Sequence, residues 1–160
     1  MRATLAGALL LVTLPIVTVD LNAEEVSCDK GVDIAKVQTL VKRTVVALKK
    51  DQAAVIRDIN SGDPKWKDGS YYMVVVQGTK ILAHGYIPTA AGLDAGAPPY
   101  DRMYPAVKIM ARIVTDKGEG CAQYDFMNPA KGGLVEHKVA YATKVSGTLW
   151  ALSGTYLVRK

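Results

Sequence analysis

Apolar positions concentrate in residues 71–85, around which we expect the fold to be organised. The segment YYMVVVQGTKILAHG places aromatic and β-branched residues on both sides of a turn at Gln77-Gly78, a pattern typical of a β-hairpin. Alternate side chains of a strand point to opposite faces, so the set containing Tyr72 and Val74 faces one way and the residues between them face the other. Because both sets are apolar, we expect this hairpin in the middle of a covered sheet.

Before the hairpin, residues 32–60 have the three- and four-residue apolar spacing of a helix that lies on a sheet. Asp51 is placed to interrupt this helix and to cap a second, shorter one. Cationic residues recur every seven positions on the opposite side, namely Lys36, Arg43, Lys50 and Arg57. Two interpretations of this basic stripe stand: a solvated outer face, or a surface that docks anionic lipid head groups or an acidic partner.

The segment 85–101 after the hairpin contains three prolines and three glycines. Connections of this length in compact domains are usually functional loops. A short helix is predicted over 104–114, and three strands follow near residues 121–127, 134–144 and 148–157. Short joints between consecutive strands favour antiparallel neighbours. The sequence therefore predicts an α+β domain whose antiparallel sheet is covered by helix and loop.

The first 23 residues are typical of a secretory signal peptide. A short basic start precedes an apolar run from Leu5 to Val19, and Ala23 provides a small residue before the expected cut. A membrane anchor is the alternative, but the run is shorter than the roughly 20 residues that a span needs. We therefore expect cleavage after Ala23, a periplasmic or secreted location, and a single domain over 24–160.

The net charge bears on the class of partner that we expect, and the two cysteines bear on disulfide and metal chemistry. The formal net charge of +5 would favour nucleic acid for a cytosolic chain, but an exported protein leaves that compartment, so we expect no nucleic-acid partner. Cys28 and Cys121 are compatible with a disulfide in an oxidising compartment or with two separate thiols, the second of them buried. Two cysteines this far apart do not form a zinc site, and we expect no metal and no cofactor.

Five stretches of the chain resemble, in order, the single Cache domain, an extracytoplasmic sensor module with a PAS-like antiparallel sheet and a long N-terminal helix. They are YYMVVVQGTKILAHG, PTAAG, GEGCAQYDFMNP, HKVAYATKV and LWALSGTY. The chain departs from the family at Cys121, where a tryptophan is common, and after Asp101, where an Asp-Gly-Lys run is missing. Cache receptors continue beyond the last strand into a transmembrane helix, whereas this chain ends at Lys160, so the resemblance implies a free-standing exported Cache protein.

The resemblance also implies a site for a small molecule, often a short organic acid, between the sheet and the long loop. Family motif positions match His84, Tyr124, Lys138 and Tyr141. We add Arg102 on chemical grounds alone, because a buried carboxylate needs cationic or hydroxyl donors. Strand alternation separates Lys138 from Tyr141; we prefer Tyr141 for the pocket and Lys138 for the surface. The alternative for His84 is a core histidine bonded to backbone, and for the tyrosines simple packing.

Catalytic motifs are missing from the sequence. It has two histidines and lacks HExxH, GxSxG and a Walker loop, so we expect no enzyme. We expect an exported sensor-type domain that binds a short organic acid, accessory to signal transduction or uptake, with a membrane receptor or histidine kinase as partner. The alternative is an interaction module without a ligand, which docks a membrane receptor or an exported redox protein through its basic helix face.

Overall fold

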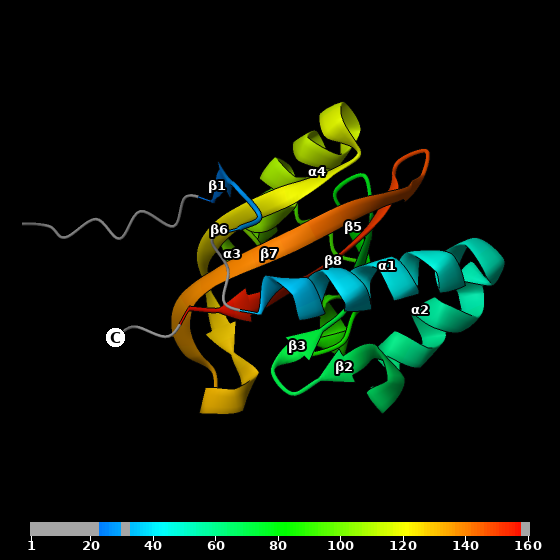
Figure 1. Cartoon of the computed structure of the whole chain (residues 1–160), viewed down its shortest axis with the longest axis horizontal. Helices are drawn as coiled ribbons and strands as arrows, with labels where there is room; N and C mark the ends of the chain where they lie inside the picture. Colours follow the sequence, from blue (N-terminus) through cyan, green and yellow to red (C-terminus); the bar gives the residue numbers. More distant parts are fainter. Residues whose placement is uncertain (1–22, 30–32, 158–160) are drawn as a thin grey trace, which may run out of the picture.

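A computed structural model describes residues 23–29 and 33–157 of the chain. Its centre is a six-stranded antiparallel sheet with the strand order β1-β6-β7-β8-β4-β5 (Figure 1). These strands are β1 (Glu24–Val26), β4 (Val74–Gln77), β5 (Lys80–His84), β6 (Glu119–Asn128), β7 (Leu134–Ser146) and β8 (Leu149–Tyr156). The remaining elements are α1 (Ile34–Lys50), α2 (Gln52–Asn60), α3 (Tyr100–Met103), α4 (Ala106–Lys117), the short pair β2 (Lys67–Asp68) and β3 (Tyr71–Tyr72), and the 3-10 turns η1 (Pro64–Trp66), η2 (Pro88–Ala90) and η3 (Pro129–Lys131).

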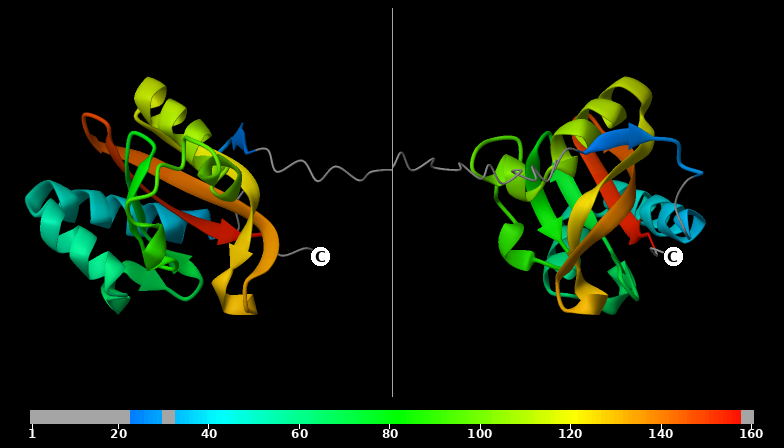
Figure 2. Two further views of the ribbon diagram at one scale, coloured as in Figure 1. Left: turned by 180° about the vertical axis from the view of Figure 1, so that it is seen from behind. Right: turned by 90° about the vertical axis from the view of Figure 1, so that its left-hand side faces the viewer.

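The sheet has a layer of helix on each face, as the edge-on view in Figure 2 shows. α1 and α2 cover one face, and α3, α4 and the long loop cover the other. The predicted face sets of the central segment are confirmed. Tyr72 and Val74 lie in the core beneath α4 and the loop, whereas Met73 and Val75 lie in the core beneath α1 and α2. The α+β class predicted from the sequence is therefore correct.

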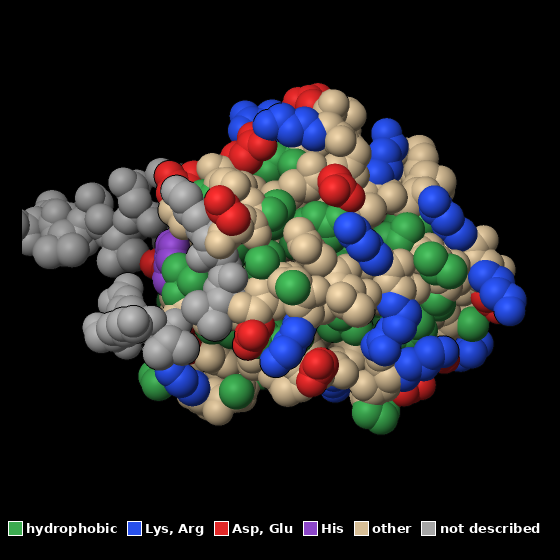
Figure 3. Space-filling view, viewed as in Figure 1, with side chains coloured by type: hydrophobic (Ala, Val, Ile, Leu, Met, Phe, Trp, Pro, Cys, Tyr) green, Lys and Arg blue, Asp and Glu red, His purple; other side chains and the backbone are tan. Residues whose placement is uncertain are grey.

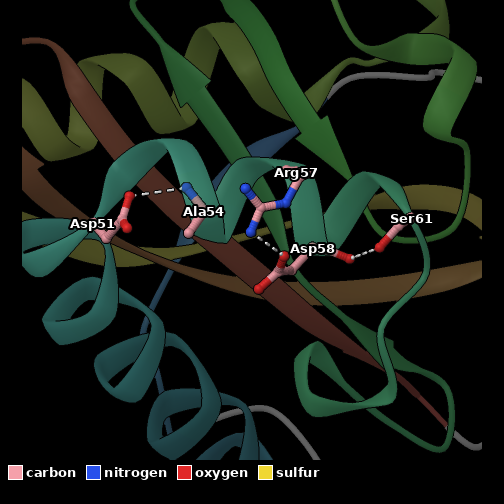
Figure 4. A network of polar contacts seen from close by, with 5 residues as sticks. All are labelled: Asp51, Ala54, Arg57, Asp58 and Ser61. Atoms are coloured by element: carbon pink, nitrogen blue, oxygen red, sulfur yellow. Dashed lines mark hydrogen bonds and ion pairs between the residues drawn. The ribbon is translucent and has the colours of Figure 1, made fainter.

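The predicted helical region is divided at Asp51, as expected. The backbone of Asp51 leaves the helical conformation, and its carboxylate accepts a hydrogen bond from the Ala54 amide at 3.0 Å. Figure 4 shows this cap, together with the Ser61 hydroxyl, which donates to the Asp58 carbonyl at the far end of α2. The cap satisfies one of the free amides that begin every helix, so α2 starts as a new helix in another direction (Figure 1).

The central position predicted for the hairpin is wrong. β4 pairs with β8, but β5 is the last strand of the sheet. The long loop folds back along its free side: the Ile81 amide donates to the Leu93 carbonyl at 2.9 Å, and the Gly92 amide donates to the Ile81 carbonyl at 2.8 Å. The apolar pattern that suggested a central hairpin reflects an edge strand that is covered by the loop.

The C-terminal half agrees with the prediction. β6, β7 and β8 form an antiparallel meander, and α4 buries Met110 and Ile113 before it ends at Gly118, whose φ of 82° favours glycine. The elements β1 and α3 were not predicted, because three or four residues carry no readable period.

A disulfide joins Cys28, next to β1, to Cys121 on β6. Of the two alternatives for the cysteines, the disulfide is confirmed and the pair of separate thiols is wrong. The expected signal peptide lies outside the described residues except for Ala23. Within the described ranges, no helix is long and apolar enough to cross a membrane, and no group of three or more His, Cys, Asp or Glu side chains is arranged to hold a metal ion.

Removing this disulfide should lower the stability of the domain. The bridged residues are 93 positions apart, and closing a loop of that length is worth about 4–5 kcal/mol in the chain-entropy model. We expect the variant with Cys28→Ser and Cys121→Ala to show a free energy of unfolding reduced by up to about that amount in urea denaturation. Reductant should destabilise the wild type and leave the variant unchanged; equal stability of the oxidised and reduced wild type would contradict the prediction.

Candidate ligand-binding site

A small cavity lies between the sheet and the layer formed by α4 and the long loop. Its volume is about 30 Å³, about two to three times what one water molecule needs. Val74 and Leu152 form part of its apolar wall. The polar side chains that line it come from five different elements or their ends, and they are Tyr72, His84, Tyr104, Tyr124 and Lys138.

Lys138 is the cation of this cavity. Its side chain comes from β7 and is almost fully buried, with 2% of the residue exposed. The ammonium donates a hydrogen bond to the Tyr72 hydroxyl at 2.9 Å and lies 4.2 Å from the centre of the Tyr72 ring and 5.0 Å from that of Tyr156. Among the described residues no carboxylate lies within ion-pair distance of it. Burial without a counter-ion lowers the pKa of Lys138 from its ordinary value to about 7.

His84 ends β5 and presents a single N–H group. Its Nδ1 accepts hydrogen bonds from the backbone amides of Tyr86 at 3.3 Å and Ile87 at 2.9 Å. These bonds assign the ring proton of the neutral imidazole to Nε2. Burial and the nearby charge of Lys138 lower the pKa of His84 to about 3, so the ring stays neutral near pH 7. The alternative prediction of a histidine bonded to backbone is thus correct for Nδ1, but the ring also lines the cavity, as the prediction of a site residue requires.

Hydroxyl groups complete the polar lining. Tyr124 is buried and lines the cavity. Burial raises the pKa of Tyr124 and of Tyr72, so both remain neutral. The cavity therefore combines an ammonium, an imidazole N–H and phenol hydroxyls, and no described residue contributes an acidic side chain to its wall. Such a set of donors suits an anion, because a buried carboxylate needs charged or strong hydrogen-bond donors.

Of the five residues predicted for the site, the structure brings three together: His84, Tyr124 and Lys138. The preference for Tyr141 over Lys138 is wrong. Tyr141 packs in the opposite core, beneath α1, and its hydroxyl donates to Glu119 at 2.7 Å. The sheet register explains this result, because Tyr124 pairs directly with Lys138 and partners in antiparallel strands share a face.

Arg102 also lies outside the cavity. It is exposed on α3 and lines a separate, more open hollow of about 150 Å³ with Met103, Asp125 and Val135. Sequence reasoning missed Tyr72 and Tyr104 as polar members of the site. The face of Tyr72 was readable from strand alternation, whereas Tyr104 follows α3 in a segment without periodic pattern.

The comparisons with known proteins place the chain in a family. The profile of the family Single Cache domain 2 matches residues 31–157. The chain belongs to this family of single Cache domains. The predicted limits of the domain, 24–160, stay a prediction. No curated protein matches the chain.

Solved structures share the fold at low sequence identity. A Cache chemosensory domain described for its recognition of carboxylic acids has a TM-score of 0.62 at 16% identity, over 78% of this chain and 92% of that one. The periplasmic sensor domain of a chemotaxis protein has a TM-score of 0.53 at 17% identity, over 76% and 88%. A methyl-accepting chemotaxis protein from Vibrio parahaemolyticus RIMD 2210633 has a TM-score of 0.58 at 12% identity, over 76% and 86%. The family is one of sensor domains, and two of these neighbours are described as a chemosensory domain and a sensor domain.

The buried charge of Lys138 should make the stability of the ligand-free protein depend on pH. Lys138 has a pKa of about 7 in the folded protein and the ordinary 10.5 when unfolded, so between these values the unfolded state binds more protons and the free energy of unfolding rises with pH. We expect this rise between about pH 7 and about pH 9.5, below the ordinary titration range of tyrosine. Lys138→Met should remove it and stabilise the protein by several kcal/mol near pH 7.

Denaturant titrations over this pH range measure the effect. Lys144→Met is the matched control, because Lys144 is exposed on the same strand and its loss removes the same charge. A wild type whose stability does not change over this range, or a Lys144→Met variant that behaves like Lys138→Met, would contradict the assignment.

Proposed function

We propose that this protein is an exported sensor domain that binds a short monocarboxylate, such as acetate or propionate, in the cavity around Lys138. The observation that carries the proposal is the buried ammonium without a counter-ion, in a cavity lined by donors. A charge buried in this way costs several kcal/mol unless an opposite charge joins it. A carboxylate would supply that charge and would accept further bonds from His84 Nε2 and the Tyr124 hydroxyl.

The size and charge of the cavity favour one carboxylate on a short chain. Of the described residues, Lys138 is the one cationic side chain in the cavity wall, so a second carboxylate would be buried unpaired. The remaining wall is apolar and suits a methyl or ethyl group. At a ceiling of about 1.5 kcal/mol per heavy atom, an acid with four heavy atoms gains at most roughly 6 kcal/mol, which corresponds to a Kd of tens of micromolar.

The comparisons support the proposed role without defining the ligand. The family consists of sensor domains, and one structural neighbour is described for carboxylic acid recognition. We propose that the protein binds the acid without converting it, in the periplasm or outside the cell. Its role would be accessory to signal transduction or uptake. In this role a membrane receptor or a histidine kinase would respond to the occupied domain.

Short acids should stabilise the wild-type protein. A ligand at 100 times its Kd adds about 2.7 kcal/mol to the free energy of unfolding, so acetate or propionate at millimolar concentration should raise the melting temperature by several degrees. Lys138→Met should abolish this shift because it removes the charge that pairs with the carboxylate, whereas Lys144→Met should keep it. If neither acid nor any other short carboxylate in a thermal-shift panel raises the melting temperature of the wild type, the proposal fails.

The basic stripe of the N-terminal helices is only partly available to a partner. Three of its four residues have partners within the protein, namely Lys36 with Asp33, Arg43 with the Lys65 carbonyl and Arg57 with Asp58. Arg57 also lies on α2 rather than α1, so the seven-residue spacing does not form one continuous row. The predicted stripe of four cationic residues is therefore not a continuous row of free charges in the structure.

A second candidate function, docking of an acidic partner surface, is favoured by the charge of α1 itself. This helix has five cationic residues and no acidic one, and Val46 is 70% exposed between Lys42, Lys49 and Lys50. Figure 3 shows Lys and Arg side chains gathered over α1 and the corner where it meets α2. We propose that a membrane receptor or an exported redox protein with an acidic surface would bind here.

Reversing Lys42, Lys49 and Lys50 to glutamate should remove this docking. We expect the wild type to be retained by the membrane fraction of its host at low salt and released at high salt, because exposed charge pairs are screened. The triple variant should not be retained. Reversal of the exposed residues Lys80, Arg112 and Lys144 is the control with equal charge change. Equal retention of the triple variant and the wild type would exclude the α1 surface, and retention by phosphatidylglycerol vesicles alone would assign it to lipid instead.

A further inference from the structure

Gly154 lies on β8 where the side chain of Lys138 crosses that strand. The register pairs Gly154 with Ala140 and Lys138 with Tyr156. A Cβ atom at Gly154 would lie 2.6 Å from Cε of Lys138 and 2.8 Å from the carbonyl oxygen of Val139. Both distances are below 3.0 Å, which real Cβ atoms essentially never show. The space that a side chain would occupy at this position is therefore filled by the lysine.

The crossing is required by the geometry of the sheet. Lys138 begins on β7, but its ammonium bonds to the hydroxyl of Tyr72 on β3 at 2.9 Å. β8 lies between β7 and β4, and Val74 of β4 is opposite Leu152 of β8. Continuing this register by two residues puts Tyr72 beside Gly154. The lysine therefore reaches Tyr72 by passing over Gly154.

Backbone conformation does not explain why position 154 is a glycine. Gly154 is not among the glycines with positive φ, so its backbone is accessible to other residues. Glycine also weakens the interior of a buried strand, where β-branched residues are preferred. The remaining explanation is the close approach of another group, and here the group in question is the Lys138 side chain together with the β7 backbone.

We propose that Gly154 is a positioning residue, whose missing side chain lets the ammonium of Lys138 cross β8 and reach the cavity. This inference rests on the proposed carboxylate site. Gly154 does not line the cavity, so its effect on a ligand acts through Lys138. Any side chain at this position would displace the ammonium from Tyr72 and from the place where it meets the carboxylate.

The test is Gly154→Ala, with acetate as the probe in isothermal titration calorimetry. We expect the Kd for acetate to rise at least tenfold. Gly120→Ala is the matched control: Gly120 also lies on a strand, and a Cβ there would meet Ile113 at 2.5 Å, away from Lys138. The control should lower the melting temperature and leave the acetate Kd within twofold of the wild type.

A stability cycle separates positioning from a merely structural role. Lys138→Ala shortens the side chain that fills the space, so Gly154→Ala should lower the melting temperature less in this background than in the wild type. If Gly154→Ala does not fold alone, folding of the double variant supports the proposal, and failure of both contradicts it. Equal losses in both backgrounds, or an unchanged acetate Kd in Gly154→Ala, would overturn it. A wild type that does not bind acetate refutes the carboxylate site instead, while the cycle still tests the packing.

Discussion

The structure depends on how the ammonium of Lys138 is kept inside the protein. A buried charge without a counter-ion is unfavourable, and here it is offset by the Tyr72 hydroxyl and by the faces of the Tyr72 and Tyr156 rings. Cation–π contacts and one hydrogen bond to a neutral hydroxyl compensate the lost hydration only in part, as the lowered pKa of Lys138 indicates. In the ligand-free site the ammonium therefore retains an unfavourable desolvation energy. A bound anion would offset this energy, and the gain would contribute to the free energy of binding.

The fold places this site on one face of the sheet and packs the other face with helix. α1 and α2 pack on the far face of the sheet, where the disulfide and Tyr141 also lie, so one layer contributes stability and the other contains the cavity. His84 is fixed at its backbone by Asn60 of α2, whose side chain accepts the His84 amide at 3.1 Å. His84 itself anchors the start of the long loop through Nδ1. A ligand that bonds to Nε2 would therefore contact a residue that is hydrogen-bonded both to α2 and to the long loop.

Local patterns predicted most of the fold, and long-range pairing decided the rest. Apolar spacing, the capping residue Asp51 and the short joints between strands located the two N-terminal helices, α4 and the C-terminal meander, because each follows from residues close in sequence. The edge position of β5 depends on loop residues such as Leu93 that return to it, and no local pattern shows that. The faces of Lys138 and Tyr141 depend on which residues of β6 lie opposite them, Tyr124 and Cys121 respectively. Both faces of β7 are buried over residues 138–142, so alternation separated the two side chains without indicating which one enters the cavity.

The proposed site requires an ammonium at Lys138 that has no counter-ion until a carboxylate binds, and the most direct test is to measure the pKa of this ammonium by NMR with and without acetate. We expect a pKa of about 7 in the ligand-free protein and an upward shift, by a unit or more, when acetate saturates the site, because a paired carboxylate favours the charged form. An ordinary lysine pKa in the ligand-free protein, or a value that does not change with acetate, would contradict it.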